Sequence, residues 1–154
     1  MRISWRSFII IGIVLILVDA FRPQLLGKDL EHIDQEKYKV AIGIKNNPNF
    51  TGGEVKFLVC YGPLMLIFKA STSRFYRDTI LLSPLALMDK DFDATIAHEL
   101  GHIEYGHSWN SDLDKAQIEA DTFAAKIVGK KRLRNIRLAS GFSKNHPLVK
   151  NLEN

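Results

Sequence analysis

The chain has 154 residues, of which 46% are hydrophobic and 25% charged, and its formal net charge is +4. This length fits one compact domain with a substantial core and is too short for two. Cys60 is the only cysteine, which excludes an internal disulfide. Its position in an apolar, strand-like run favours a buried thiol over a nucleophile.

The N-terminus has the pattern of an export segment. Two arginines precede an unbroken apolar run from Phe8 to Val18, as in a secretory signal peptide. Cleavage after Ala20 and retention as a membrane anchor both fit this pattern, and a buried globular helix is the third interpretation. We therefore expect residues 1–20 to form a hydrophobic helix that is a signal peptide or anchor, and residues 21–154 to form an exported domain, periplasmic, extracellular or membrane-anchored.

The next part of the chain is typical of a small sheet. Residues 37–45 alternate apolar side chains with polar or small ones, which is the period of a half-buried strand. Residues 54–61, 63–70 and 77–84 are apolar runs separated by turn-forming residues, and Pro84 ends the last of them. These four segments predict a small antiparallel sheet.

The second half of the chain has helical periodicity. Apolar residues recur at helical spacing from Phe92 to Ile103, and Gly106 ends this helix. A second helix follows and ends before Gly129, and residues 130–140 predict a shorter, basic helix. The apolar stripe of the second helix consists of Leu113, Ala116, Ala120, Phe123, Ala124 and Ile127. The fold class is therefore α+β.

Charge is unevenly distributed along these helices. Residues 126–150 contain eight basic residues and no acid, whereas residues 89–121 contain nine acids and two bases. The basic segment suits either an anionic membrane surface or an ordinary solvated helix face. Because no aromatic residues are interleaved for base stacking, we do not expect nucleic acid as a partner.

The stretch "HELGH" contains His98, Glu99 and His102 on the first long helix. Residues four apart project from the same helix face, so both imidazoles can bind one zinc ion. Glu99 is placed to act as the general base on a metal-activated water, which would hydrolyse a peptide bond. The alternative is a plain amphipathic helix that happens to contain histidines.

A hydrolytic zinc site needs a third protein ligand and an open fourth position. We favour Glu119 on the second helix as this ligand, with Asp121 holding a histidine from behind. His107, five residues after His102, is a weaker candidate because Gly106 ends the helix between them. Both acids could instead belong to a solvated helix surface.

The chain resembles a protease family at this point. "HELGH", the later "EADTFAAKIVG" and the downstream "NHPLVKNL" are together similar to gluzincin zinc metalloproteases of the HtpX and CAAX-processing type. The resemblance covers Thr79 to Leu152 and implies a zincin-like domain, in which the sheet packs on the active helix and on a second, ligand-bearing helix. It also implies that residues 79–83 pair with an extended substrate and that His146 lies near the metal, whereas a turn histidine before Pro147 is the alternative for His146.

The sequence departs from this family at one position. The liganding glutamate of the family commonly lies four residues before the aspartate, and that position is Gln117 here. Glutamine is a poor zinc ligand, and residues two apart on a helix face different ways. Either Glu119 reaches the metal, or Asp121 or Asp114 takes its place.

These observations predict a zinc-dependent endopeptidase with one Zn²⁺ and a protein or peptide substrate. Membrane association through the N-terminus and the basic C-terminal helix would fit the same prediction. A membrane-associated binding or chaperone-like module without turnover is the alternative, which Gln117 keeps open. A cytoplasmic regulatory protease is a third hypothesis, against which the export segment counts.

Overall fold

The computed structural model describes residues 27–61, 70–72, 78–107 and 112–153, so segment 1–20 and nearly all of the expected strand 63–70 lie outside it. The described elements are β1 (Lys28–Asp29), α3 (Leu30–Ile33), α4 (Gln35–Lys45), β2 (Lys56–Val59), β3 (Ala70–Thr72), β4 (Thr79–Leu82), α5 (Pro84–Leu87), α6 (Phe92–Glu104), α7 (Leu113–Val128), α8 (Lys130–Ala139) and α9 (Pro147–Lys150). This confirms the α+β class. In the described part of the chain, no helix has both the length and the apolarity needed to cross a bilayer.

The sheet is mixed, so the prediction of an antiparallel sheet is wrong for its central pair. The strand order is β1-β2-β4-β3, and β2 runs parallel to β4 with Lys56 opposite Thr79. The two outer pairs are antiparallel. A parallel pair needs a long crossover, and the chain between Val59 and Thr79 provides one that includes β3. Because β4 has a neighbouring strand on each side, the expectation that it pairs with an extended substrate is also wrong.

Residues 37–45 form most of helix α4 rather than the predicted strand. The side chain of Asp34 accepts a hydrogen bond from the Lys37 backbone N–H at 3.0 Å and caps the helix. Ala41 and Ile44 are buried three residues apart, whereas Val40, an inward residue of the predicted strand, is 41% exposed. The burial therefore follows the helical period. The alternation of apolar residues in the sequence does not correspond to a strand.

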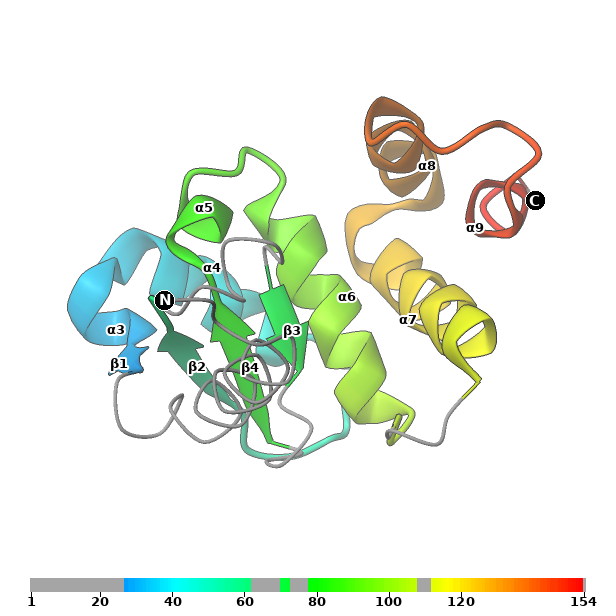
Figure 1. Ribbon diagram of the computed structural model, residues 1–154. Helices are drawn as coiled ribbons and strands as arrows, with labels where there is room; N and C mark the ends of the chain where they lie inside the picture. Colours follow the sequence, from blue (N-terminus) through cyan, green and yellow to red (C-terminus); the bar gives the residue numbers. More distant parts are fainter. Residues whose placement is uncertain (1–26, 62–69, 73–77, 108–111, 154) are drawn as a thin grey trace, which may run out of the picture.

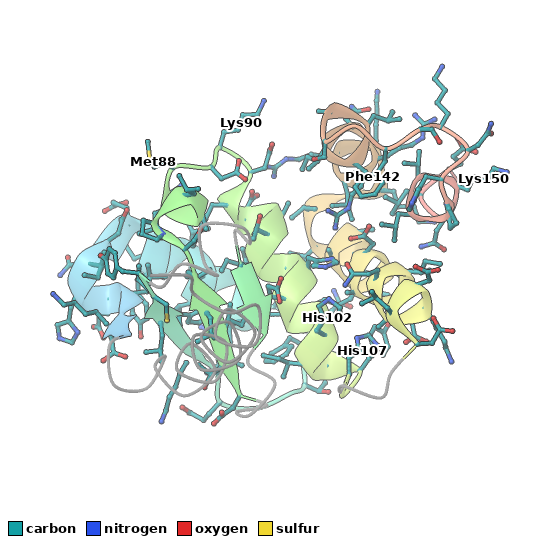
Figure 2. All side chains as sticks on the ribbon, viewed as in Figure 1. Met88, Lys90, His102, His107, Phe142 and Lys150 are labelled. Atoms are coloured by element: carbon teal, nitrogen blue, oxygen red, sulfur yellow. The ribbon has the colours of Figure 1, made fainter. Side chains whose placement is uncertain are left out.

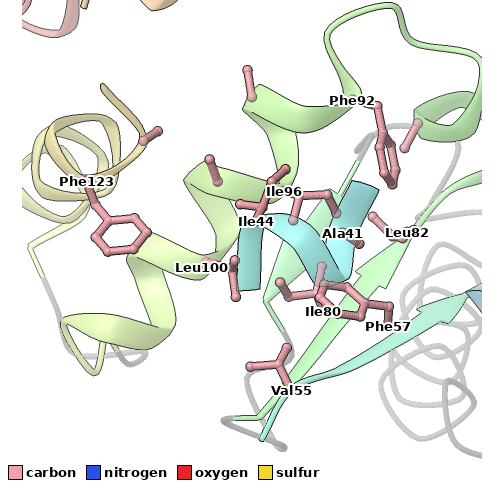
Figure 3. Close-up of a cluster of buried hydrophobic side chains, with 14 of the residues drawn as sticks. Ala41, Ile44, Val55, Phe57, Ile80, Leu82, Phe92, Ile96, Leu100 and Phe123 are labelled. Carbon is pink, nitrogen blue, oxygen red and sulfur yellow. The ribbon is translucent and has the colours of Figure 1, made fainter. Parts of the chain in front are cut away.

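Helix α6 lies between the sheet and α7, and α4 contacts it on the sheet side (Figure 1). Strand β4 ends before Pro84, as predicted, and a short helix α5 that the sequence did not predict follows, with the Ser83 hydroxyl as its cap and Pro84 in its first turn. The core packed between α4, α6 and the sheet is drawn in Figure 3. It includes Ala41, Ile44, Phe57, Ile80, Leu82, Phe92, Ile96 and Leu100. This core anchors one face of α6 and leaves another face for α7.

Helices α6 and α7 approach each other to backbone contact at Gly101. A Cβ added to Gly101 would lie 2.8 Å from the Cα and 2.9 Å from the carbonyl oxygen of Ala120, and 3.1 Å from the Cβ of Phe123. Real Cβ atoms do not come this close to backbone atoms, so only glycine fits here. The fourth residue of "HELGH" therefore sets how near α7 lies to the histidines.

Replacement of Gly101 by alanine is expected to lower the free energy of unfolding by about 1–2 kcal/mol, as measured in urea. Alanine gains about 1 kcal/mol of helix propensity, but the overpacking against Ala120 costs about 1–3 kcal/mol. Gly43→Ala is the matched control, because that glycine is in α4 and has nothing within 4 Å of its added Cβ. The control should be stabilised, and a stabilised Gly101→Ala would show that the helices are not in such close contact.

Helices α8 and α9 contact α7 and lie above it in the view of Figure 1. Arg132 of α8 forms ion pairs with Asp91 and Asp93 at the start of α6. Arg134 forms another with Glu153. Arg132 of the basic segment thus pairs with acids of the earlier segment, while its side chain stays 44% exposed.

The predicted stripe of α7 is correct except at its first residue. Ala116, Ala120, Phe123 and Ala124 are buried, whereas Leu113 is 69% exposed in the first turn. The Asp112 side chain caps this helix by accepting a hydrogen bond from the Lys115 backbone N–H.

Candidate metal centre

His98 and His102 lie one turn apart on α6 and direct their Nε2 atoms at each other. The two Nε2 atoms are 3.2 Å apart, and the rings stand at 90° with their centroids 4.8 Å apart. Figure 2 shows His102 at the side of α6 that faces α7. The helix therefore brings the two predicted ligands to one point.

His98 is held from behind by a buried carboxylate. Its Nδ1 lies 2.8 Å from Oδ1 of Asp121, which is 0% exposed. Because an ionised carboxylate only accepts hydrogen bonds, His98 carries its proton on Nδ1 and has a lone pair on Nε2. The sequence predicted that Asp121 would hold a histidine in this way.

Asp121 is kept ionised by a second partner, Arg137 of α8. The Arg137 Nε donates to Asp121 Oδ2 at 2.8 Å, and its Nη2 donates to Asp121 Oδ1. Burial alone would raise the pKa of Asp121, but the hydrogen bonds from His98 and Arg137 outweigh it and hold this pKa below its usual value. The carboxylate is therefore charged at neutral pH.

His102 has a histidine as its outer partner. The Nδ1 atoms of His102 and His107 are 2.8 Å apart, and His107 Nε2 donates to Glu119 Oε2 at 2.9 Å. Burial, followed by the charges of His98 and His107, lowers the pKa of His102 to about 3, so its imidazole is neutral at ordinary pH. Neutral imidazole is the form that binds metal ions.

Glu119, the expected third ligand, is placed away from the point where His98 and His102 meet. Its carboxylate bonds His107 and lies 3.8 Å from the Lys115 ammonium. Asp114, another candidate, is exposed in the first turn of α7. Within the described residues, no three His, Cys, Asp or Glu side chains converge as a metal site.

Gln117, also on α7, reaches the side of the histidine pair where the two Nε2 atoms meet. Its Nε2 lies 3.3 Å from His102 Nε2. The nitrogen and oxygen of a side-chain amide exchange places by a half-turn of the terminal torsion. The structure thus brings this amide to the position that the family resemblance assigns to a glutamate.

Glu99 is 7% exposed and follows His98 directly on α6.

His146 makes its contacts outside the cluster of His98, His102 and His107. Its Nδ1 accepts the Leu148 backbone N–H at 3.3 Å, and its ring packs on Phe142. These contacts match the alternative of a turn histidine before Pro147.

The geometry of the two imidazoles fits a zinc ion. Two nitrogens bound to one tetrahedral zinc at about 2.0–2.1 Å are about 3.3–3.4 Å apart, close to the 3.2 Å between the two Nε2 atoms. This distance is also within hydrogen-bond range, as is the 2.8 Å between the Nδ1 atoms of His102 and His107. A metal ion bound by both imidazoles would lie between the Nε2 atoms of His98 and His102.

Arg137 is the functional residue that the sequence did not single out, because it was assigned to a basic, solvated helix. Its spacing carried a signal. Arg137 lies four residues after Leu133, which is buried, so both project from the face of α8 that packs on the protein.

Searches of protein-family models, curated proteins and solved structures gave no match to this chain.

Proposed function

We propose that the chain is a zinc-dependent endopeptidase. The observation that carries the proposal is the pair of His98 and His102 Nε2 atoms, 3.2 Å apart, with a buried glutamate beside them. Bound zinc would supply Lewis-acid polarisation of the scissile carbonyl and would lower the pKa of the attacking water. The substrate is a protein or peptide, and the packing of α6 on the sheet and on α7 supports a zincin-like arrangement.

His98 and His102 would hold the metal, and Gln117 would supply the third donor through its amide oxygen. This revises the expected ligand Glu119, because its carboxylate is occupied with His107 in the described structure. An amide oxygen is neutral, so the centre would keep one more unit of positive charge than a centre with two histidines and a glutamate. We therefore expect weaker metal binding and stronger polarisation of the substrate.

Glu99 would move the proton. As a carboxylate next to a metal ligand, it can accept a proton from water as the water attacks the peptide carbon, and can then deliver it to the leaving amine nitrogen. Its burial shields it from bulk water and favours proton transfer within the site. No other described acid adjoins either of the paired histidines along α6.

The proposal includes export by segment 1–20, as a signal peptide or a membrane anchor, since the arginines and the apolar run support it. The runner-up function is a binding or chaperone-like module without turnover. Gln117 favours that function, because a neutral third donor binds zinc less tightly than a carboxylate would.

Zinc content and cleavage of an unfolded protein test the proposal directly. We expect about one equivalent of zinc per full-length chain and slow cleavage of unfolded casein that stops with a chelator. A zinc-loaded chain that cleaves neither casein nor short peptides would support the binding module. A chain that binds no zinc would contradict both the metal site and the enzyme.

Substitution of Gln117 by glutamate should tighten zinc binding by at least about tenfold, or about 1.4 kcal/mol, because a carboxylate adds charge attraction at the metal. Gln117→Leu should weaken it. Competition with a chromophoric chelator measures both, and Asp114→Asn, at an exposed position of the same helix, is the control. Equal affinities for wild type, Gln117→Glu and Gln117→Leu would exclude Gln117 as a ligand.

A further inference from the structure

His107 and Glu119 form a hydrogen-bonded chain behind His102. Glu119 lies on α7, His107 follows the end of α6, and His102 is in the last turn of α6. Gly106, at φ +62°, turns the chain there, and the His107 backbone N–H donates to the His102 carbonyl at 3.0 Å. Tyr105 stacks on the His107 ring. This local structure fixes His107 against the back of His102.

The direction of the hydrogen bonds follows from the acid at the outer end. An ionised Glu119 can only accept, so His107 donates from Nε2. A neutral His107 then has an acceptor at Nδ1, and His102 must donate to it from its own Nδ1. That leaves the lone pair of His102 on Nε2, the atom that faces His98.

Gln117 touches the other end of the His102 ring. Its side-chain amide nitrogen lies 3.3 Å from His102 Nε2. Because the amide can present either its nitrogen or its oxygen here after a half-turn, this contact is compatible with a lone pair on Nε2 but does not select the tautomer. The direction of the hydrogen bonds is therefore set by Glu119 and His107.

We propose that His107 and Glu119 are positioning residues, an outer relay that fixes His102 as its Nδ1–H tautomer so that its Nε2 lone pair faces that of His98. The inference rests on the proposed function for the identity of the metal, but its tautomer statement holds for the metal-free chain. In this proposal, Glu119 and His107 act by orienting His102 and do not bind the zinc ion themselves.

Glu119→Gln is the sharpest variant, because it keeps the shape of the side chain but no longer fixes the direction of the hydrogen bonds from His102 through His107. A glutamine can donate to His107 Nε2, which would reverse the chain and place the proton of His102 on Nε2. His107→Leu removes the relay altogether. His107→Gln can rescue it, since its oxygen accepts from His102 and its nitrogen donates to Glu119.

The test combines nitrogen-15 NMR of the imidazoles of the metal-free, full-length chain with zinc and cobalt affinities of the same proteins. The chain has five histidines, so the ring signals are few enough to assign. We expect His102 to carry its proton on Nδ1 in wild type and in His107→Gln. Glu119→Gln should show both tautomers, and zinc affinity should fall about 10–100-fold in His107→Leu, as for other outer partners of liganding histidines.

Each result has a distinct meaning. A proton on Nε2 of His102 in the metal-free wild type would overturn the relay, as would measurable zinc affinities that are equal in wild type, Glu119→Gln and His107→Leu. If wild type binds no zinc but Glu119→Gln shifts the His102 tautomer, the relay stands and the proposed enzyme fails. Urea unfolding of each variant, with Asp114→Asn as the exposed control, separates loss of affinity from loss of folding.

Discussion

Glu99→Gln is expected to lower the rate of peptide hydrolysis about 10²–10⁴-fold while zinc content stays unchanged. The loss corresponds to the contribution of a positioned general base. Glutamine has the shape of glutamate but cannot accept the proton of an attacking water, and it is not placed among the metal-holding side chains. Single-turnover cleavage of a peptide, with zinc measured on the same sample, records both quantities.

Glu104→Gln is the matched control on the same helix. The Glu104 carboxylate accepts hydrogen bonds from the Thr51 backbone N–H and hydroxyl, both at 2.7 Å. Its replacement should change stability by about 1 kcal/mol and leave the rate of hydrolysis as it is. A zinc-loaded Glu99→Gln protein that cleaves at the wild-type rate would refute the assigned role of Glu99.

Asp121→Ala should lower the free energy of unfolding by about 3–5 kcal/mol, the cost of removing one partner of a buried ion pair. The carboxylate is 0% exposed and joins three helices, α6 through His98, α7 through its own backbone and α8 through Arg137. Its loss leaves the Arg137 guanidinium and the His98 Nδ1–H without the carboxylate that accepts their hydrogen bonds. Since whole domains are stable by about 5–15 kcal/mol, urea unfolding will detect this change.

A double substitution separates charge from packing at this junction. Replacing Asp121 by leucine and Arg137 by methionine removes both charges and should recover much of the lost stability. Zinc affinity should stay low, because His98 still lacks the acceptor that fixes its ring. Asp114→Ala, at an exposed position of the same helix, should change stability by less than about 0.5 kcal/mol. Equal stability of Asp121→Ala and wild type would contradict the buried pair.

The elements with a strong local signal could be predicted from the sequence. Helix α6 begins at the expected residue, and strand β4 lies within the expected segment 77–84 and ends before Pro84, because Ser83, Pro84 and the helical spacing after Phe92 act within a few residues. Helix α4 was missed because Tyr38, Val40, Ile42 and Ile44 also satisfy a strand period, and β-branched residues favour strands. The Asp34 cap was the local signal that outweighed them. The parallel β2–β4 pair depends on a long-range crossover, which no local pattern specifies.

The candidate site, like the fold, could be predicted from the sequence only in part. The positions of His98 and His102 follow from helix geometry alone, and Asp121 was placed behind a histidine because metal-binding histidines usually donate to a carboxylate. The side chain of α7 that reaches the histidines depends on how this helix is rotated against α6. That rotation results from tertiary contacts such as Gly101 with Ala120, so the choice between Gln117 and Glu119 could not be made from spacing.

The glycine within "HELGH" has a consequence for transplanting the centre into other proteins. Grafting residues 98–102 onto an unrelated helix would reproduce two neighbouring imidazoles and a carboxylate, but no further donor. A neighbouring helix must come within touching distance of the graft's main chain, with a small residue such as Ala120 at the crossing. A transplant that aims to recreate the site therefore has to carry both helices and the crossing point together.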